Sequence, residues 1–310
     1  MESVQNLKKR LKAVNNIHHI TKAMELVAAT KMRKSQEVAL NSRPYAFAVL
    51  DLLACLTKQQ IEQTGILEKR KIKKTLIVLM ASDKGLVGSF NSNLFKAFDK
   101  FIKEQGIDYK SEAYSFLAVG EKANNFLQKK GAKIVAKFIR VGDFVLTSQT
   151  KPISEFLVAG YLKNDFDKVI AVSMNFKSAF LQSPITRELF PVSFDNIKKT
   201  IQDMIPQTGK FADLIKEKDI SFLDEKTSDY IFEPSIEEIL EDLVKHLINM
   251  EIYHLILEAN ASEHAAKRVA MKNASDNAQD LSSKLNLTYN KSRQAGITNE
   301  LIEITAGAQV

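Results

Sequence analysis

Hydrophobic residues recur at helical spacing through both ends of the chain. From Ser235 to Ala295 the sequence contains no proline or glycine, and Pro234 followed by Ser235 and Glu238 is a typical helix start. One helix of that length would measure on the order of 90 Å, more than the width of a compact domain. Its first apolar positions, together with one histidine, alternate steps of four and three, as in a left-handed coiled coil. These positions are Ile236, Leu240, Leu243, Leu247, Met250, His254, Leu257 and Ala261. We therefore expect this helix to project and to require a partner helix.

Residues 3 to about 58 are the natural partner, because their apolar positions also recur at steps of three and four. The first of these positions are Val4, Leu7, Leu11, Val14, Ile17, Ile20, Met24 and Val27. Pro44 is expected to kink the helix near Arg43, after which the apolar pattern resumes from Phe47 to Leu56. Two long helices at opposite ends of a chain, separated by a folded middle, pair most simply in antiparallel fashion.

The middle of the chain changes to short apolar runs that alternate with amphipathic segments, a pattern typical of a doubly wound α/β domain. Strands are expected at Thr75–Ala81, Ala113–Val119, Lys133–Phe138, Lys168–Asn175 and Ser183–Phe194. Helices are expected at Asn91–Gln105, Glu121–Lys130 and from Thr147 or Ile153 to Lys163. The last strand should be an antiparallel edge, because its prolines cannot donate within a sheet centre. Polar, lysine-rich residues 198–228 predict a loose connection, and a short segment at 230–232 precedes Pro234.

Charge is distributed unevenly along the 310 residues, whose formal net charge is +7. Eight lysines or arginines stand among residues 1–34 against only Glu2 and Glu25, so this segment alone carries +6. Such a segment favours an acidic partner, which could be nucleic acid, anionic lipid or an acidic protein loop. The sequence has no apolar stretch of about 18 residues, so no membrane span is predicted. It starts without a targeting leader, and we expect the protein to begin at Met1.

Few residues suggest chemistry. The loop Ser82–Ser89, SDKGLVGS, is glycine-rich and follows a strand, but it lacks both the Gly-Lys-Ser ending of a P-loop and the third glycine of a dinucleotide fingerprint. A structural turn is the stronger interpretation. The five histidines do not show metal-ligand spacing, and Cys55 lies in an apolar run that favours a buried thiol. We expect no catalytic residue, no metal site and no cofactor.

From Ala259 to Asp280 the long helix is rich in alanine, which favours helix formation but buries little area per contact. This composition predicts a thin helix pair. It fits equally well an exposed helix lying on another surface and a shaft that must fit within a narrow surround, and the residues alone leave both open.

Three blocks of residues resemble the gamma subunit, or central stalk, of F-type rotary ATP synthases. The blocks are ITKAMELVAATKMRKSQ at 20–36, SDKGLVGSFN at 82–91, and ASEHAAKRVAMKNASDNA with YNKSRQAGITNELIEITAGA at 261–278 and 289–308. They stand in the family's order and include both chain ends. The resemblance implies an antiparallel coiled coil of the termini, carried by a doubly wound, Rossmann-like α/β domain. It implies domains at residues 1–60 (N-terminal coiled-coil helix), 70–232 (α/β foot) and 235–310 (C-terminal coiled-coil helix).

By resemblance, this subunit is a non-catalytic rotor shaft that couples ion-driven rotation of the membrane c ring to conformational change at the catalytic beta subunits. The implied partners are the alpha and beta subunits of the hexamer, the epsilon subunit and the c ring, with one copy per complex. The implied contacts with the hexamer are Met24, Lys267, Gln294, Thr298 and Glu300. Tyr230 and Glu233 match foot residues near the epsilon subunit and the c ring.

Three positions depart from the family pattern. Lys267 stands where arginine is usual, which keeps the charge but loses the bidentate fork. Val87 replaces a loop cysteine, and Gly296 replaces an alanine, a change that could loosen the helix by up to ~1 kcal/mol.

Met24 could instead be a core residue, since Ile20 and Val27 share its stripe. The remaining contact residues could be ordinary helix surface, and Tyr230 with Glu233 a simple edge before a proline.

Two other functions remain to be weighed. A coiled-coil nucleic-acid-binding or scaffold protein would use the basic N-terminal helix, although acidic residues and the lack of interleaved aromatics argue against it. An enzyme would use the loop at 82–89. If the resemblance holds, the missing leader predicts a peripheral protein at the cytoplasmic face of a bacterial inner membrane.

Overall fold

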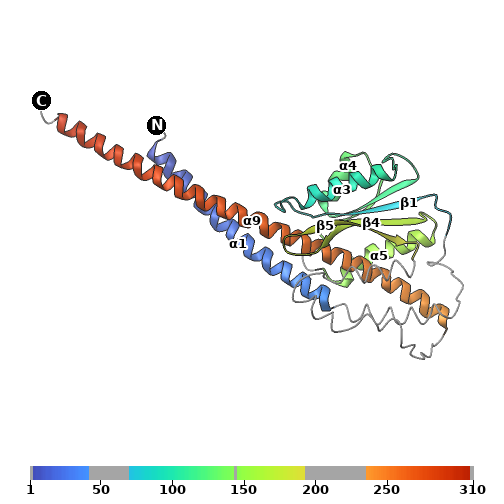
Figure 1. Cartoon of the computed structure of the whole chain (residues 1–310). Helices are drawn as coiled ribbons and strands as arrows, with labels where there is room; N and C mark the ends of the chain where they lie inside the picture. The colour runs from blue at the N-terminus through green and yellow to red at the C-terminus, as the bar shows by residue number, and fades with distance from the viewer. Residues whose placement is uncertain (1–2, 42–69, 143–144, 193–234, 308–310) are drawn as a thin grey trace. The chain divides into compact units, whose positions relative to one another are not determined.

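The computed structural model describes residues 3–41, 70–142, 145–192 and 235–307. Two very long helices enclose an α/β segment in the chain order (Figure 1). The elements are α1 (Val4–Asn41), β1 (Thr75–Met80), α3 (Phe90–Glu104), β2 (Tyr114–Val119), α4 (Glu121–Lys129), β3 (Ile134–Phe138), α5 (Thr147–Leu162), β4 (Lys168–Phe176), β5 (Gln182–Phe190) and α9 (Ile236–Gly307). They form two compact units, one of residues 1–29 and 267–310, the other of residues 30–266.

A five-stranded sheet forms the centre of the second unit, with strand order β3-β2-β1-β4-β5. The first four strands are parallel, whereas β5 pairs with β4 in antiparallel fashion. The chain winds from β1 outward to β3 and then crosses to β4 on the other side of β1, so the sheet is doubly wound as the sequence predicts. The expected antiparallel edge strand is also confirmed, with Pro184 opposite Met174.

Helices cover both faces of the sheet (Figure 1), which explains why β1 is buried along its whole length. Ile77 and Leu79 of β1 face a core shared with α3 and α4. Their neighbours Leu76, Val78 and Met80 face the opposite core, which includes Ile153, Leu157 and Tyr161 of α5. Alternate residues of one strand therefore hold two helical layers together.

The leucine-rich part of α9 completes that second layer. Its buried residues Val244, Leu247, Ile248, Ile252, Tyr253, Leu255, Ile256 and Leu257 belong to the same core as α5 and the sheet. The described members of the predicted heptad, from Leu243 to Ala261, are all buried or half-buried. The side chains of Ile236 and Leu240 lie outside the described residues.

The first part of α9 is therefore buried more widely than the single heptad seam that the sequence predicts. Six consecutive side chains, 252–257, are buried, so α9 is enclosed on all sides there rather than along a single seam. A helix segment that is buried on all sides is a core element rather than one half of a seam.

In the first unit, α1 and α9 lie side by side and run in opposite directions (Figure 1). The antiparallel direction follows from two hydrogen-bonded pairs, Asn15 with Ser282 and His18 with Ser275, since the α9 partner moves toward the C-terminus as the α1 residue moves toward the N-terminus. The predicted antiparallel pairing is confirmed there. Among the described helices none is long and apolar enough to cross a membrane.

Several predictions fall outside the described residues. They are the kink near Arg43, the renewed apolar pattern with Cys55, the connection at 198–228 and the segment at 230–232.

Candidate functional site

The first unit has a regular seam between its two helices. On α1 the buried and half-buried positions recur at steps of three and four, and α9 shows the matching repeat. The repeat on α1 consists of Val4, Leu7, Leu11, Val14, His18, Thr21, Glu25 and Ala28, and Met24 and Ala29 beside it are also half-buried. The repeat on α9 consists of Met271, Ser275, Ala278, Ser282, Leu285, Tyr289 and Ser292, and Ala274, Ala295 and Gly296 beside it are also half-buried. This unit is therefore a heptad coiled coil in which small and polar side chains occupy many core positions.

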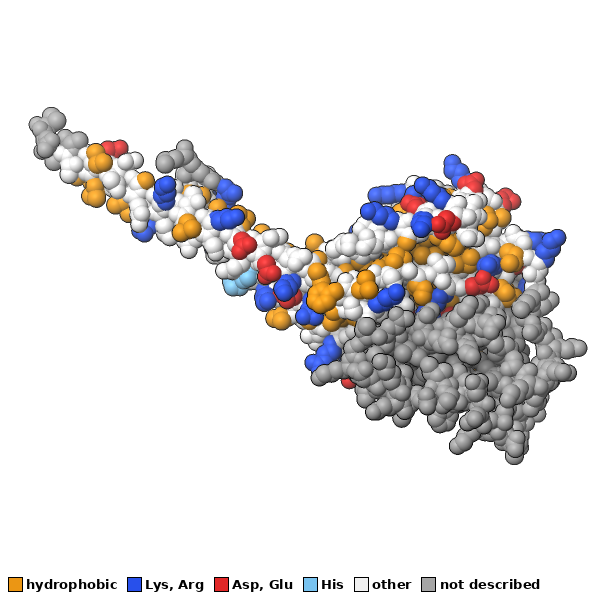
Figure 2. Space-filling view, in the orientation of Figure 1, with side chains coloured by type: hydrophobic (Ala, Val, Ile, Leu, Met, Phe, Trp, Pro, Cys, Tyr) orange, Lys and Arg blue, Asp and Glu red, His pale blue; other side chains and the backbone are white. Residues whose placement is uncertain are grey.

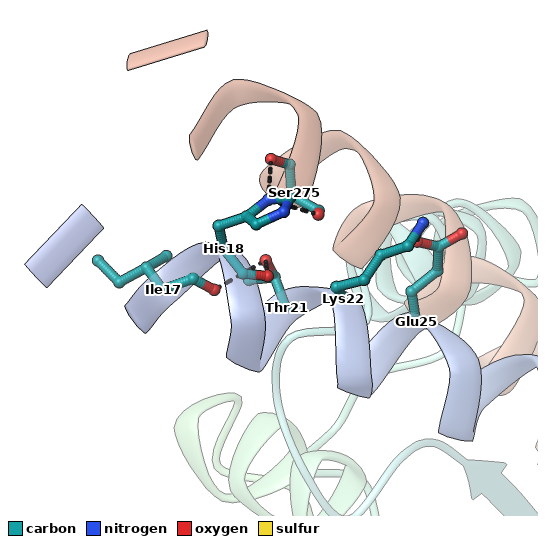
Figure 3. Close-up of polar contacts among 6 residues, drawn as sticks. All are labelled: Ile17, His18, Thr21, Lys22, Glu25 and Ser275. Atoms are coloured by element: carbon teal, nitrogen blue, oxygen red, sulfur yellow. Dashed lines mark hydrogen bonds and ion pairs between the residues drawn. The ribbon is translucent and has the colours of Figure 1, made fainter. Parts of the chain in front are cut away.

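Polar pairs cross this seam, and Figure 3 shows the one between His18 and Ser275. Nδ1 of His18 lies 3.1 Å from the hydroxyl and 3.1 Å from the carbonyl oxygen of Ser275, so the ring can accept from the first or donate to the second according to its tautomer. The hydroxyl of Ser282 donates to the Asn15 side chain at 2.5 Å. Such pairs specify one register of the two helices at some cost in stability.

Glu25, the one acidic seam residue among the described part of α1, is neutralised locally. Its side chain is 12% exposed and accepts a hydrogen bond from Lys22 Nζ at 2.9 Å (Figure 3). One turn earlier, the Thr21 hydroxyl donates to the carbonyl of Ile17 at 2.9 Å. Both polar groups are therefore satisfied within α1.

The predicted apolar stripe of α1 agrees with the seam only as far as Val14. Beyond it, Ile17, Ile20 and Val27 are 51%, 59% and 53% exposed, and Met24 is half-buried. Each of these four residues directly precedes a seam residue, so it lies about 100° away around the helix. The apolar stripe thus forms an outer face of the helix pair, and Figure 2 shows hydrophobic side chains at that unit's surface among charged ones.

Other predicted contact residues also lie on the helix surface. Gln294, Thr298 and Glu300 are exposed on α9, where the Thr298 hydroxyl donates to the Gln294 carbonyl at 2.9 Å. Lys267 is half-buried. Tyr230 and Glu233 lie outside the described residues.

The loop after β1 is held by its own side chains. The Asp83 carboxylate accepts hydrogen bonds from the backbone N–H groups of Glu121 at 3.0 Å and Arg140 at 3.1 Å. Asn91 donates to the Ser82 hydroxyl at 2.7 Å. Glu121 begins α4, and a helix N-terminus is where a phosphate would bind in a nucleotide site. Because Asp83 already occupies that position, the geometry supports a structural turn.

A cavity of about 380 Å³ opens beside this loop, at the carboxyl ends of β1 and β2. Its lining includes Asp83, Lys84, Arg140 and Glu263, which carry both signs of charge. The lining of this cavity therefore favours neither an anionic nor a cationic ligand. Among the residues that the structure describes, no group of three or more His, Cys, Asp or Glu could hold a metal ion.

An antiparallel coiled coil of the two chain ends and a doubly wound α/β domain define the class as a two-unit coiled-coil protein, and the described residues show no catalytic or metal site. Comparison with known proteins gives the family. A family model described as ATP synthase matches residues 3–310. The ATP synthase gamma chain of Opitutus terrae is 37% identical over 307 residues, covering 99% of this chain and 98% of that protein. The gamma chain of Moorella thermoacetica is 34% identical over 309 residues and 99% of both. The chain belongs to the ATP synthase gamma chain family.

Solved structures agree in fold. The central stalk and c-ring structure of the Tetrahymena thermophila mitochondrial ATP synthase contains a chain with a TM-score of 0.57 and 23% identity, covering 83% of this chain and 99% of that one. A chain from the Euglena gracilis mitochondrial ATP synthase, in a structure of its OSCP, F1 and c-ring, gives a TM-score of 0.61 at 17% identity, covering 99% of this chain and 93% of that one.

Proposed function

We propose that this chain is the central rotor shaft of an F-type ATP synthase. It couples ion-driven rotation of the c ring to conformational change at the catalytic beta subunits, and works in reverse during hydrolysis. The observation that carries this proposal is the full-length similarity to curated gamma chains. The heptad coiled coil of the two chain ends supports it, because a paired helix resists bending and twisting better than a single one.

The chain itself makes and breaks no bonds in this proposal, and the ATP chemistry takes place on the beta subunits. The loop after β1 supports a non-catalytic role, since the Asp83 carboxylate of that loop already occupies the N-terminus of α4, where a nucleotide phosphate would bind. The role of the chain is mechanical. Its asymmetric surface presents different side chains to each beta subunit as it turns.

Residues 1–60 and 235–310 would supply the shaft, and residues 70–232 the foot. The outer face of the coiled coil would contact the alpha and beta subunits through Met24, Lys267, Gln294, Thr298 and Glu300. Exposure of the last three on α9 supports this assignment. Tyr230 and Glu233 would contact the epsilon subunit and the c ring. One copy per complex would sit peripherally at the cytoplasmic face of a bacterial inner membrane.

Affinity purification of the tagged chain from native membranes tests the proposal. We expect alpha, beta, epsilon and c subunits to be recovered with it, and inverted vesicles from the same cells to acidify when given ATP. Recovery of the chain as a lone monomer would contradict the proposal. Salt-sensitive retention on DNA in the same preparation would instead favour the nucleic-acid alternative.

A further inference from the structure

The segment of α9 at residues 252–257 contributes five apolar side chains to the core of the second unit, and its one polar side chain, His254, is buried as well. Apolar contacts of this kind are strong but non-directional, and they give less rotational specificity than hydrogen bonds. A helix that must transmit torque through its domain needs contacts that define one rotational setting.

One such contact joins α9 to α5. The Asn249 carboxamide oxygen lies 3.2 Å from the Thr150 hydroxyl and 3.1 Å from the Ser154 hydroxyl, and each hydroxyl can direct its single proton either to this oxygen or to a backbone carbonyl of α5 at 2.9 Å. Thr150 is fully buried and Ser154 nearly so. Reversing the amide would let its N–H groups donate to both hydroxyls, so the contact persists in either orientation. Asn249 thus bridges two successive turns of α5.

A second contact joins α9 to β5. Glu258 Oε2 lies 4.0 Å from Arg187 Nη2, a distance at which the two charges attract each other without a hydrogen bond between these atoms, and the two side chains are 12% and 7% exposed. A buried ion pair contributes little net stability compared with apolar residues of similar volume, whereas it strongly disfavours arrangements that separate the charges. Its effect is therefore on specificity of position more than on stability.

The two contacts lie on opposite sides of the helix. Asn249 and Glu258 are nine residues apart, which corresponds to about 180° around the axis and about 14 Å along it. Any rotation of α9 about its own axis would move both side chains away from their partners. Asn260, about 20° from Asn249 around the helix, adds a hydrogen bond to the carbonyl of Gly142 at 3.1 Å.

The geometry points to Asn249 and Glu258 as positioning residues that lock the rotational register of α9 in the α/β domain. With Thr150, Ser154 and Arg187 they pass torque between the domain and the helix. This inference rests on the proposed function. It predicts that removing the polar contacts uncouples rotation from ion pumping even when the chain folds and assembles normally.

A triple variant, Asn249→Leu with Arg187→Met and Glu258→Leu, provides the test. It should fold, because the Thr150 and Ser154 hydroxyls each keep a backbone carbonyl of their own helix at 2.9 Å. Replacing both members of a buried ion pair by apolar residues is often neutral for stability. The matched control is Asp242→Asn with Lys245→Gln, which removes a surface ion pair of the same helix.

The measurement is ATP-driven acidification per ATP hydrolysed in inverted vesicles carrying the whole complex. The melting temperature of each chain and the amount of assembled complex are measured in parallel. We expect the acidification per ATP hydrolysed to fall by roughly threefold or more in the triple variant. Its melting temperature and its amount of assembled complex should stay close to wild type. The control should keep the wild-type ratio.

An unchanged ratio in the triple variant would overturn the inference. So would a loss of acidification that only follows a loss of assembled complex, because that result indicates a purely structural role. Recovery of the wild-type chain without alpha, beta, epsilon and c subunits would refute the proposed function, and this inference with it.

Discussion

His18 and Ser275, which are 257 positions apart in the sequence, meet across the seam of the first unit, where Nδ1 of the histidine lies 3.1 Å from the serine hydroxyl. Ser275 is buried, so its hydroxyl depends on a partner within the helix pair. A polar pair at a seam position specifies alignment, since sliding by one turn would leave both groups without it.

Coupling between these two residues is directly measurable. Ser275→Ala should cost about 1 kcal/mol of unfolding free energy in the wild-type chain, and about zero in a His18→Leu background, where the hydroxyl has already lost its partner. Urea unfolding of the full chain, followed by circular dichroism, gives the unfolding free energies of the wild type, the two single variants and the double variant. His19→Leu is the control, because His19 is exposed. The changes in unfolding free energy caused by His19→Leu and by Ser275→Ala should simply add in the double variant. Equal coupling energies of His18 and His19 with Ser275 would contradict the contact between His18 and Ser275.

The outer face of α1 predicts a contrast between two apolar residues of one helix. Ile20 is 59% exposed and Leu7 only 2%. Ile20→Asp should change the unfolding free energy by no more than about 0.5 kcal/mol, whereas Leu7→Asp buries an unpaired charge and should cost more than about 3 kcal/mol. In assembled complexes Ile20→Asp should lower ATPase activity while the isolated chain stays folded. A large loss of stability in Ile20→Asp would place this residue inside the seam instead.

Gly120 marks a close approach between β2 and the chain after β1. Its φ is +93°, and a Cβ there would lie 2.0 Å from the carbonyl oxygen of Ala81. Gly120→Ala should therefore cost about 3 kcal/mol or more, through backbone strain and displacement of that carbonyl.

The nearby Gly85 serves as control for Gly120, because nothing lies within 4 Å of the corresponding Cβ. Gly85→Ala should stay within about 1 kcal/mol of wild type and could even stabilise the chain. Thermal melting of both variants makes the comparison, and similar melting temperatures would be incompatible with the close approach.

Asp167 links the strand region before β1 to β4 and predicts an acid dependence of stability. Burial acts to raise the pKa of its carboxyl group, but hydrogen bonds from the backbone N–H groups of Lys73 and Lys74, together with the nearby Arg70 charge, lower the pKa below its ordinary value. A carboxyl group whose pKa is lower in the folded state stabilises the fold above the unfolded pKa, about 3.9. That contribution is lost as the pH falls through the folded pKa.

Asp167→Asn should therefore lower stability at pH 7 and reduce the further loss below about pH 4. Urea midpoints measured from pH 7 to about pH 3 test this expectation. The exposed neighbour Asp165 provides the control, since Asp165→Asn should leave the acid dependence as in wild type. An unchanged acid profile in Asp167→Asn would show that these hydrogen bonds are unimportant.

Local sequence predicted much of the fold because short apolar runs and periodic stripes each carry enough information to define an element. The run at 75–80 is buried on both faces in the structure, as a central strand must be, and the prolines near 184 and 191 correctly indicated an edge. The loop at 82–91 was also interpretable, since it lacks the residues of a nucleotide site. Its actual stabilising contact, from Asp83 to Arg140, joins loops 57 positions apart and has no local signature.

The sequence by itself determined that both chain ends are long helices, that they pair in antiparallel fashion, and that an α/β layer lies between them. Only the tertiary structure decided which stripe of α1 faces its partner and that the leucine-rich start of α9 is a core element of the α/β domain. The physical reason is that periodicity records how a residue repeats along its own helix. It does not record what lies across from it, so Ile20, which the stripe predicts for the seam, lies on the outer face, while the polar His18 lies in the seam.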